Sequence, residues 1–248
     1  MPAERAARAI VAGTFDVVIA AGGDGTVNEI ANGLAGLDSP PPIGLIPLGT
    51  ANVLAAEIGL ATTAHAAAKA ILVGKRRAIR LGLANGRHFV LMASAGLDAQ
   101  VVAGLDLAFK RRMGRLAYVW ESLVSALRYE FPPLSILADG RQFEARMAVV
   151  CKGRCYGGPF VAAPDARLDA SLFYLVLMER GGFTNVVRYG VALALGRLGR
   201  LADVRIVPVH HAVIAGNQGA PVQADGDVAA RLPVEISLAS RTLELAGP

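Results

Sequence analysis

Residues 22–29 read Gly22-Gly23-Asp24-Gly25-Thr26-Val27-Asn28-Glu29 and directly follow the apolar run Val17-Val18-Ile19-Ala20-Ala21. The apolar run predicts a buried strand, and the glycine-rich stretch predicts a tight turn that opens a helix. Glycines let the main chain approach a ligand and adopt backbone angles that side chains disfavour. Because the N–H groups at a helix N-terminus bind anions, this stretch predicts a phosphate-binding loop at the carboxyl end of a strand.

Asp24 complicates a simple phosphate site, because its carboxylate would repel phosphate oxygens. A divalent cation between the two would remove that repulsion, so the loop predicts a metal–nucleotide complex rather than bare phosphate. The alternative interpretation is a tight turn without a ligand. Asp-Gly is a typical turn dipeptide, and it recurs in this chain at Asp139-Gly140 and Asp225-Gly226.

A second, similar unit favours the functional interpretation. Ile43-Gly44-Leu45-Ile46 predicts another short buried strand, which is followed by Pro47-Leu48-Gly49-Thr50-Ala51-Asn52 and then by the helical pattern of residues 53–57. Two consecutive strand–loop–helix units place two polar loops side by side along one edge of a parallel sheet, where ligands of such sheets bind.

Together, the two loops resemble the catalytic domain of the diacylglycerol kinase and sphingosine kinase family, and the bacterial lipid kinases look closest. The resemblance covers nearly the whole chain and continues, in the family's order, at Gly96-Leu97-Asp98-Ala99, Gly114-Arg115-Leu116-Ala117-Tyr118, Tyr156-Gly157-Gly158, Ala163-Pro164-Asp165-Ala166 and Gln223-Ala224-Asp225-Gly226-Asp227. It implies a Rossmann-like, three-layer α/β nucleotide-binding lobe beside a second, β-rich and sandwich-like lobe. The resemblance also implies that the active cleft lies between the lobes and that the final strand returns to the first.

The pattern along the chain also changes in a way that indicates two lobes. Up to about residue 77, strands alternate with helices, including an alanine-rich helix that Thr62 and Thr63 cap. Short alternating segments follow, beginning with a hairpin predicted at Asn85-Gly86. We expect the nucleotide-binding lobe at residues 1–77, a β-rich lid or substrate lobe at 78–238, and a C-terminal strand at 239–248 that returns to the first lobe.

Members of the family normally open with a strand and an Asn-Pro-type loop that contributes to the nucleotide site. Only 21 residues precede Gly22, which suffices for one helix and one strand. We therefore expect an N-terminally truncated nucleotide lobe without that opening unit. A missing strand would expose a sheet edge and invite self-association, for example as a homodimer.

The resemblance also implies the residues of the active site. ATP binding falls on Gly22, Gly23, Asp24, Gly25, Thr26, Val27, Asn28, Gly49 and Thr50. The carboxylates of the family's Asp-Gly-Glu motif act as the base toward the substrate hydroxyl, which implies Asp225 and Asp227 as catalytic residues here. Asp227 departs from the motif because its side chain is one methylene shorter than glutamate. Without the resemblance, this segment would be interpreted as a polar hairpin turn.

The resemblance implies Mg²⁺ as a cofactor beside ATP as co-substrate. In bacterial members, an aspartate at the position of Asp169 helps to hold a structural magnesium with two backbone carbonyls, which here are those of Ala166 and Ser171. Ala170 departs from the glycine that usually follows the aspartate. Asp24 and Asp98 would join a water network between the lobes. The alternatives are a solvated turn for Asp169 and a helix cap for Asp98.

Composition adds the expected surroundings of the protein. The formal net charge of +5 and the pI near 9.6 suit phosphate substrates, anionic lipid or nucleic acid alike. No stretch approaches the ~18 uninterrupted apolar residues of a membrane span. We expect a cytoplasmic, peripherally membrane-associated protein with a lipid substrate and no nucleic-acid partner.

A cluster of basic residues lies among apolar neighbours at Lys110-Arg111-Arg112 and Arg115. This cluster predicts a basic amphipathic helix that docks on an anionic membrane surface, with a solvated helix face as the alternative.

The favoured reaction is transfer of the γ-phosphate of ATP to a lipid hydroxyl, as in a diacylglycerol kinase. NAD kinase is the first alternative, because its family shares the Gly-Gly-Asp-Gly-Thr loop and a related fold. Residues 47–52 and 225–227 favour the lipid kinase. A non-catalytic nucleotide- or lipid-binding protein is the second alternative, given the missing opening unit, Asp227 and Ala170.

Overall fold

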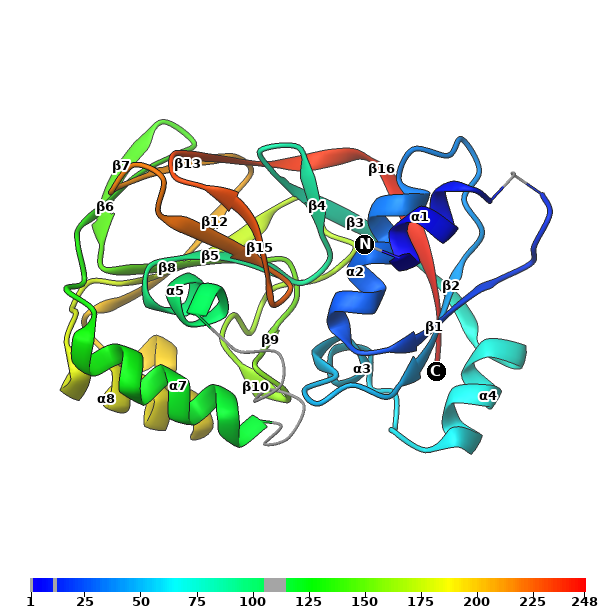
Figure 1. The fold of residues 1–248 in the computed structure, drawn as a ribbon, viewed down its shortest axis with the longest axis horizontal. Helices are drawn as coiled ribbons and strands as arrows, with labels where there is room; N and C mark the ends of the chain where they lie inside the picture. Colours follow the sequence, from blue (N-terminus) through cyan, green and yellow to red (C-terminus); the bar gives the residue numbers. More distant parts are fainter. Residues whose placement is uncertain (1, 11–12, 105–114) are drawn as a thin grey trace.

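The computed structural model describes residues 2–10, 13–104 and 115–248. Two lobes lie side by side, and both ends of the chain lie in the same lobe (Figure 1). The first lobe is mixed α/β, and the second is built mainly from two packed sheets with helices on one side. The predicted fold class, an α/β lobe beside a β-rich, sandwich-like lobe, is confirmed.

The first lobe contains both predicted strand–loop–helix units. Its elements are α1 (Pro2–Arg8), β1 (Val18–Gly22), α2 (Asp24–Leu34), β2 (Ile43–Pro47), α3 (Val53–Ile58) and α4 (Ala64–Val73). β1 and β2 run parallel, with Val18 opposite Ile43 and Gly22 opposite Pro47. Because both strands end at the same edge of the sheet, the two glycine-containing loops that follow them are neighbours.

Helices lie on both sides of this sheet (Figure 1). On one side α4 packs closely, since a Cβ added at Gly44 would lie 2.8 Å from Cγ1 of Ile71; α2 lies on the other side. The predicted cap of α4 is present, because Oγ1 of Thr63 accepts a hydrogen bond from the N–H of Ala66 over 3.2 Å. Within the described residues β1 forms the outer edge of the sheet, with Ile19 46% exposed.

A long antiparallel ribbon joins the two lobes. It consists of β3 (Lys75–Ala84) and β16 (Val234–Gly247), which pair from Lys75–Gly247 to Ala84–Ile236 with an irregularity between Leu238 and Thr242. The end of β16 also pairs in parallel with β2, with Leu245 opposite Ile43, so the last strand lies in the sheet of the first lobe. The boundary expected at residue 77 falls inside β3, because this strand continues through both lobes.

The second lobe is a sandwich of two sheets. In chain order its elements are β4 (Arg87–Phe89), β5 (Met92–Ala95), α5 (Leu97–Gly104), α7 (Arg115–Arg128), β6 (Leu134–Ala138), β7 (Arg141–Ala145), β8 (Met147–Cys151), β9 (Cys155–Tyr156), β10 (Phe160–Val161), β11 (Phe173–Met178), α8 (Phe183–Ala194), the 3₁₀ helix η1 (Leu198–Arg200), β12 (Val204–Val209), β13 (Ala212–Ala215), β14 (Pro221–Ala224) and β15 (Asp227–Arg231). One sheet has the order β12-β11-β8-β5-β14-β15, and β13, β6 and β7 extend the other sheet from β16.

Tight turns and a small residue shape the sandwich. Asn85-Gly86, Asp139-Gly140 and Asp225-Gly226 all have positive φ at both positions and connect antiparallel strands, which confirms the predicted hairpin at Asn85-Gly86. Inside the sandwich the rings of Phe89 and Phe173 stack with their centroids 5.8 Å apart. Gly82 leaves space for this pair, since a Cβ there would lie 2.2 Å from Cζ of Phe89.

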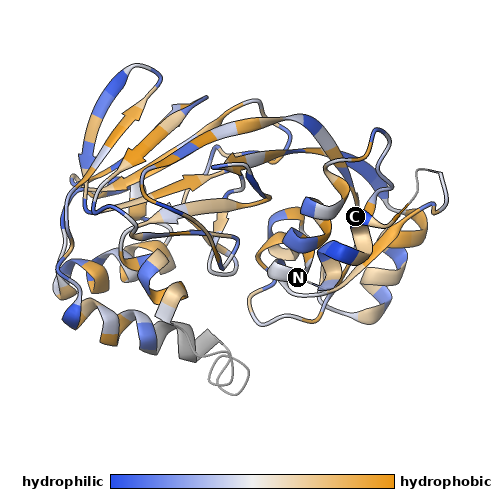
Figure 2. Cartoon of the chain, turned by 45° about the horizontal axis from the view of Figure 1, so that its top comes forward, coloured by the Kyte–Doolittle hydropathy of each residue, from blue (hydrophilic) through white to orange (hydrophobic). Residues whose placement is uncertain are grey.

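Apolar residues run along the strands of both lobes, whereas polar residues gather in the outer loops (Figure 2). A second layer of packing lies outside the sandwich, where α5, α7 and α8 cover the six-stranded sheet. Val149 and Val176 of that sheet belong to the same buried cluster as Val101 of α5, Ala126 of α7 and Tyr189 of α8. Among the described helices, none combines the length and hydrophobicity that crossing a membrane requires.

Candidate active site

The two glycine loops of the first lobe pack backbone against backbone. A Cβ added at Gly49 would lie 2.3 Å from Cα of Gly23, and one added at Gly22 would lie 2.3 Å from Oγ1 of Thr26. Gly22, Gly23 and Gly49 do not have positive φ values. These glycines are therefore required by close contacts within the protein, and not by the unusual backbone angles that we expected.

Asp24 joins the two loops. Its Oδ2 accepts a hydrogen bond from the N–H of Val53 and its Oδ1 from the N–H of Leu54, each over 3.0 Å. These N–H groups belong to the first turn of α3, so Asp24 caps that helix from the neighbouring loop. The α3 N-terminus compensates the charge of Asp24. Asp24 thus has compensating partners within the protein without a metal ion, and its place in a water network with Asp98 stays a prediction.

The first turn of α2 offers the expected anion site. Gly23 is the residue that precedes the helix, and its carbonyl accepts from the N–H groups of Thr26 and Val27 over 3.0 and 3.2 Å. The preceding N–H groups of such a turn have no acceptor within the helix, and the helix dipole favours an anion there. Val27 itself is 5% exposed and packs into the core, whereas Thr50 lies exposed on the second loop.

A small hollow between the loops carries an unpartnered acceptor. It is lined by Ala20, Gly22, Gly23, Val27, Asn52, Leu54 and neighbouring residues. Asn52 donates from its amide to the carbonyl of Gly49 over 2.8 Å, but its buried Oδ1 has no partner within the described part of the chain. A buried acceptor of this kind is costly unless a donor satisfies it. A hollow of about 10 Å³ holds no more than a single water molecule, which would satisfy this oxygen, so the anion site rests on the α2 N-terminus alone.

Asp227 lies against the first of these loops. A Cβ added at Gly25 would lie 3.2 Å from Oδ2 of Asp227, so the carboxylate faces the first turn of α2. Asp227 stands at the start of β15 and is partly exposed. Although aspartate is one methylene shorter than glutamate, its carboxylate reaches the loop. The structure thus brings the glycine loop and the acidic turn together, as the sequence predicts.

Asp225, by contrast, is a buried acceptor whose oxygens both have partners. Its Oδ1 accepts from the N–H groups of Leu91 and Met92 over 2.9 and 3.1 Å, and its Oδ2 accepts from the N–H of Val90 over 2.6 Å and from the amide of Asn28 over 2.8 Å. Burial raises the pKa of Asp225 above its usual value, and these hydrogen bonds oppose the shift. We therefore correct its expected role, because a carboxylate enclosed in this way does not face a substrate hydroxyl.

Asn28 and Asn32 hold the second lobe from one face of α2. Both amides donate to the carbonyl of His88 over 3.0 Å, and Oδ1 of Asn32 accepts from the N–H of His88 over 3.0 Å. Asn28, Asn32, His88 and Asp225 form what we call the α2 clasp. The expected role of Asn28 as a nucleotide donor is corrected accordingly, because its amide hydrogens point into this clasp.

Gln223 orients the acidic turn. Its Oε1 accepts from the N–H of Gly226 over 2.9 Å, and its Nε2 donates to Oγ of Ser94 and to Oδ2 of Asp98, each over 2.9 Å. Ser94 also donates to Asp98 over 2.5 Å. Asp98 therefore belongs to the hydrogen-bonded support of the turn that precedes Asp227. The role of Gln223 was not predicted from the sequence, although its position within the block of residues 223–227 was a usable signal.

A second contact between the lobes is centred on Glu57 of α3. Its side chain is 5% exposed and accepts from Nε of Arg154 over 3.2 Å and from the N–H of Cys155 over 2.8 Å. Because both partners follow β8 in the second lobe, this contact restrains the opening of the lobes next to the glycine loops. No sequence pattern predicted this role for Glu57.

The loop between β10 and β11, residues 163–172, does not fit the expected magnesium ion. Asp169 is paired with Arg167 through two hydrogen bonds of 3.0 and 2.9 Å, which lower the pKa of Asp169. The buried Lys152 ammonium donates to the carbonyls of Arg167 and Ala170 over 2.8 and 2.6 Å. Burial lowers the pKa of Lys152 to about 8 and Asp169 opposes the shift, so the amine is protonated at neutral pH.

Magnesium prefers several oxygen ligands in octahedral geometry. Within the described ranges, no group of three or more carboxylate, histidine or cysteine side chains could hold a metal ion. Of the basic cluster expected to contact a membrane, Lys110, Arg111 and Arg112 lie outside the described residues, and Arg115 begins α7.

Comparison with known proteins agrees with this arrangement. Residues 1–84 match the diacylglycerol kinase catalytic domain, and residues 91–247 match the YegS C-terminal NAD kinase beta sandwich-like domain. A diacylglycerol kinase from Bacillus subtilis (strain 168) is 30% identical over 238 residues, covering 94% of this chain and 78% of the relative. One from Staphylococcus aureus (strain JH9) is 27% identical over 239 residues, covering 94% and 75%.

Solved structures share the fold. A diacylglycerol kinase from Bacillus anthracis (strain Sterne) superposes with a TM-score of 0.80 at 23% identity, covering 99% of this chain and 82% of that one. Another structure from the same organism superposes with a TM-score of 0.82 at 24% identity, covering 100% and 83%. With the two-lobe fold, the two family models and the Bacillus subtilis relative in agreement, the chain belongs to the diacylglycerol kinase family.

Proposed function

We propose that this protein is an ATP-dependent lipid kinase that transfers the γ-phosphate of ATP to a lipid hydroxyl. The observation that carries the proposal is the position of Asp227, whose Oδ2 faces the α2 N-terminus at Gly25. An anion site and a carboxylate able to accept a proton therefore lie on the two sides of one junction between lobes. Phosphoryl transfer needs little more from a protein than such positioning and charge stabilisation.

In the proposed reaction, the N-terminal turn of α2 and the loop at Gly49 and Thr50 hold the phosphates of ATP. The oxygen of the lipid hydroxyl attacks the γ-phosphorus, the bond from that phosphorus to the β–γ bridging oxygen breaks, and ADP leaves. Asp227 accepts the hydroxyl proton. Asp225 and Gln223 keep the turn in place and take no proton, because their polar atoms are hydrogen-bonded within the protein.

A magnesium ion bound with the nucleotide would neutralise charge on the phosphates. The nucleotide and water would supply most of its ligands. Asp24 and Asp98 already accept hydrogen bonds from protein donors, so they would reach such an ion only through water. This nucleotide-associated ion is distinct from the structural magnesium that loop 163–172 does not fit.

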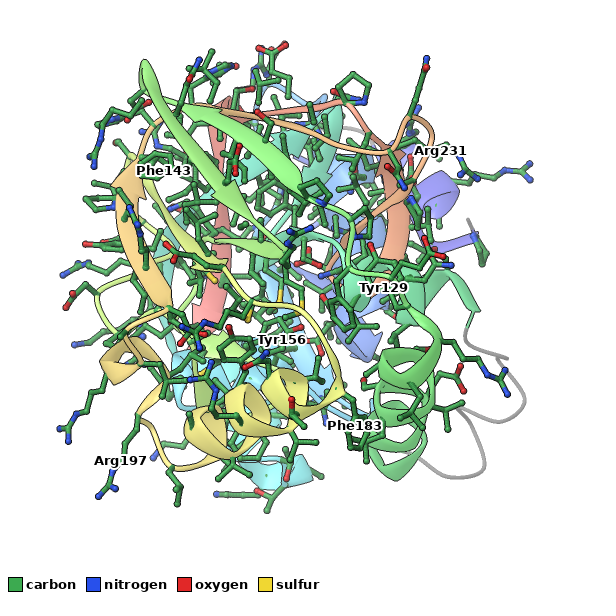
Figure 3. The ribbon with its side chains drawn as sticks, turned by 90° about the vertical axis from the view of Figure 1, so that its left-hand side faces the viewer. Tyr129, Phe143, Tyr156, Phe183, Arg197 and Arg231 are labelled. Carbon is green, nitrogen blue, oxygen red and sulfur yellow. The ribbon has the colours of Figure 1, made fainter. Side chains whose placement is uncertain are left out.

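A lipid kinase must meet its substrate at a bilayer, and we propose that α8 faces an anionic membrane. Four apolar side chains spaced four residues apart are exposed: Phe183 (37%), Val187 (39%), Val191 (55%) and Leu195 (64%). Residues 180–202 contain four arginines; Arg180 and Arg188 pair with Asp203, so Arg197 and Arg200 form the basic flank. Figure 3 shows Phe183 at the start of α8 and Arg197 pointing outward beyond its other end.

An apolar stripe with a basic flank is the pattern of helices that lie in a membrane interface, where anionic headgroups attract the arginines. The proposal thus places the protein in the cytoplasm, where ATP is available, and peripherally on the membrane. The basic residues 110–112 would add to the same attraction.

The test is to incubate the full chain with γ-labelled ATP and MgCl₂ and to identify the labelled product. Separate reactions contain diacylglycerol in anionic vesicles, a total bacterial lipid extract, and NAD. Label in a lipid supports the proposal, whereas label in NADP identifies an NAD kinase. Calorimetric binding of ATP with no transfer to any of these acceptors would identify a non-catalytic binding protein.

A further inference from the structure

Lys152 is a charged residue enclosed within the second lobe. It directly follows β8, and its side chain is 0% exposed. A buried ammonium is tolerated only where it is paired and hydrogen-bonded. Here its Nζ donates to the carbonyl of Arg167 over 2.8 Å and to that of Ala170 over 2.6 Å. Both acceptors belong to loop 163–172, so the buried ammonium supplies hydrogen-bond donors to two backbone carbonyls of this loop.

The charges around Lys152 oppose a divalent cation in this loop. The Asp169 carboxylate, the only acidic side chain of the expected magnesium site, is paired with Arg167. The Arg80 guanidinium also acts on Lys152 through its positive charge. A metal ion held by Asp169 would have to displace the exposed Arg167 and sit near the buried Lys152 ammonium, whose positive charge repels a divalent cation.

We propose that the Lys152 ammonium is the resident cation of loop 163–172, and that this loop keeps its conformation without a divalent metal ion. The ammonium donates its N–H groups to backbone carbonyls, whereas a metal would take lone pairs from the same class of oxygen. The loop thus replaces a bound metal with a covalently attached charge. The carbonyls that Lys152 takes, those of Arg167 and Ala170, stand next in the chain to the expected magnesium ligands, the carbonyls of Ala166 and Ser171.

The same lysine connects the loop to the contact between the lobes. The N–H of Lys152 donates to the carbonyl of Leu91 over 2.7 Å, and the N–H of Leu91 donates to Asp225 in the α2 clasp over 2.9 Å. On its other side, the loop is held to β3 because the N–H of Arg80 donates to the carbonyl of Leu168 over 2.9 Å. These bonds are made by backbone groups and persist without the ammonium, so its removal should loosen the loop between Lys152 and β3.

The first experiment measures thermal unfolding of the full chain without nucleotide or lipid. The chain is compared in EDTA, in MgCl₂ and in CaCl₂. We expect the same Tm in all three, because the loop already holds its cation. A Tm that falls in EDTA and recovers with MgCl₂ would overturn the proposal.

The second experiment replaces the charge with an apolar side chain of similar length. Lys152→Met leaves the carbonyls of Arg167 and Ala170 without their buried donor, and we expect Tm to fall by roughly 5–10 °C without recovery in MgCl₂. Lys69→Met, at an exposed lysine of α4, is the matched control and should leave Tm unchanged. An unchanged Tm in Lys152→Met contradicts the proposal.

If Lys152→Met does not fold, the Tm of the unsubstituted chain in EDTA and in MgCl₂ still tests whether the loop needs a metal ion. Neither experiment contains ATP or lipid, and neither reads activity. A failure here therefore leaves the proposed phosphoryl transfer standing, and a failure of that transfer leaves the role of Lys152 standing.

Discussion

The side-chain amide of Asn28 donates to Oδ2 of Asp225 over 2.8 Å, although the two residues are 197 positions apart in the chain. Asn28 lies on α2 in the first lobe, and Asp225 lies in the turn between β14 and β15 in the second lobe. This bond fixes the acidic turn relative to the N-terminal end of α2. In the proposed reaction, the distance between Asp227 and the phosphates of ATP would therefore depend on the α2 clasp.

Asp225→Asn should destabilise the protein and reduce turnover together. The new amide would turn an N–H₂ group toward backbone N–H donors, so we expect the free energy of unfolding to fall by about 1–3 kcal/mol. Urea unfolding at pH 7 measures this loss. The control is Asp139→Asn in the similar turn of β6 and β7, where the carboxylate is 34% exposed and the loss should be smaller. Equal losses at the two positions would argue against the clasp.

Asp227→Asn should remove proton transfer and leave nucleotide binding intact. We expect the rate of transfer to a lipid hydroxyl to fall by on the order of 10²–10⁴-fold, the usual range for loss of a general base. Calorimetry with ATP should give an unchanged dissociation constant. Asp165→Asn, at an exposed aspartate of loop 163–172, should retain full turnover. Undiminished transfer by Asp227→Asn would exclude that residue from the mechanism.

Alanine at two loop glycines should distinguish a glycine that lets Asp227 reach its position from one that lets the two loops pack together. A Cβ at Gly25 would approach the Asp227 carboxylate to 3.2 Å, so Gly25→Ala should fold but lose turnover as that flexible side chain shifts. A Cβ at Gly49 would lie 2.3 Å from the backbone of Gly23, so Gly49→Ala should lose about 1–3 kcal/mol of stability.

Gly36→Ala is the control for both glycine variants, because a Cβ there meets no atom within 4 Å. Urea unfolding and the labelled-ATP assay are run on the three variants side by side. A stable, fully active Gly49→Ala protein would show that the two loops do not pack as described.

Asp203 should make the stability of the second lobe depend on acidic pH. Burial alone would raise its pKa, but hydrogen bonds from Arg188 and Tyr189 outweigh burial and lower the pKa below the usual 3.8. An acid with a lowered pKa in the folded state stabilises the fold above its unfolded pKa, and this contribution is lost as pH falls through the folded value.

The contribution of Asp203 to the free energy of unfolding should therefore be constant from pH 7 to about pH 5 and decline below pH 3.8. Asp203→Asn should lower stability at pH 7 and flatten this decline, as measured by urea unfolding across the pH range. Asp38→Asn is the control, because its side chain is 92% exposed. An unchanged decline in Asp203→Asn would assign the acid sensitivity to other carboxylates.

Charge on the outer face of α8 should weaken binding to anionic vesicles. We expect the double variant Val191→Asp and Leu195→Asp to lose at least about tenfold in partitioning onto phosphatidylglycerol vesicles, because both apolar burial and attraction to headgroups are reduced. Vesicle flotation measures the bound fraction. Leu72→Asp, at a leucine of α4 that is 80% exposed, should bind as the unsubstituted chain does. Unchanged flotation of the double variant would mean that α8 does not face the membrane.

Much of the local structure was predictable because it depends on neighbours in the chain. The strands before Gly22 and Pro47, the cap at Thr63 and the hairpin at Asn85-Gly86 all follow from short patterns of apolar, capping and turn residues. The meeting of the glycine loop with the acidic turn was predictable only through the resemblance to a family, since no local pattern links positions 25 and 227.

By itself, the sequence determined the two strand–loop–helix units, the fold class and the family. Only the tertiary structure decided which polar side chains face a ligand and which hold the protein together. Asp24, Asn28 and Asp225 all look like ligand-binding residues in the sequence, yet each has partners from a distant segment. The physical reason is that a side chain's hydrogen-bond partner is set by how separate elements pack, and the energy of a buried polar group depends on that partner. For the same reason, the pairing of Lys152 with loop 163–172 could not be read from residues near Lys152.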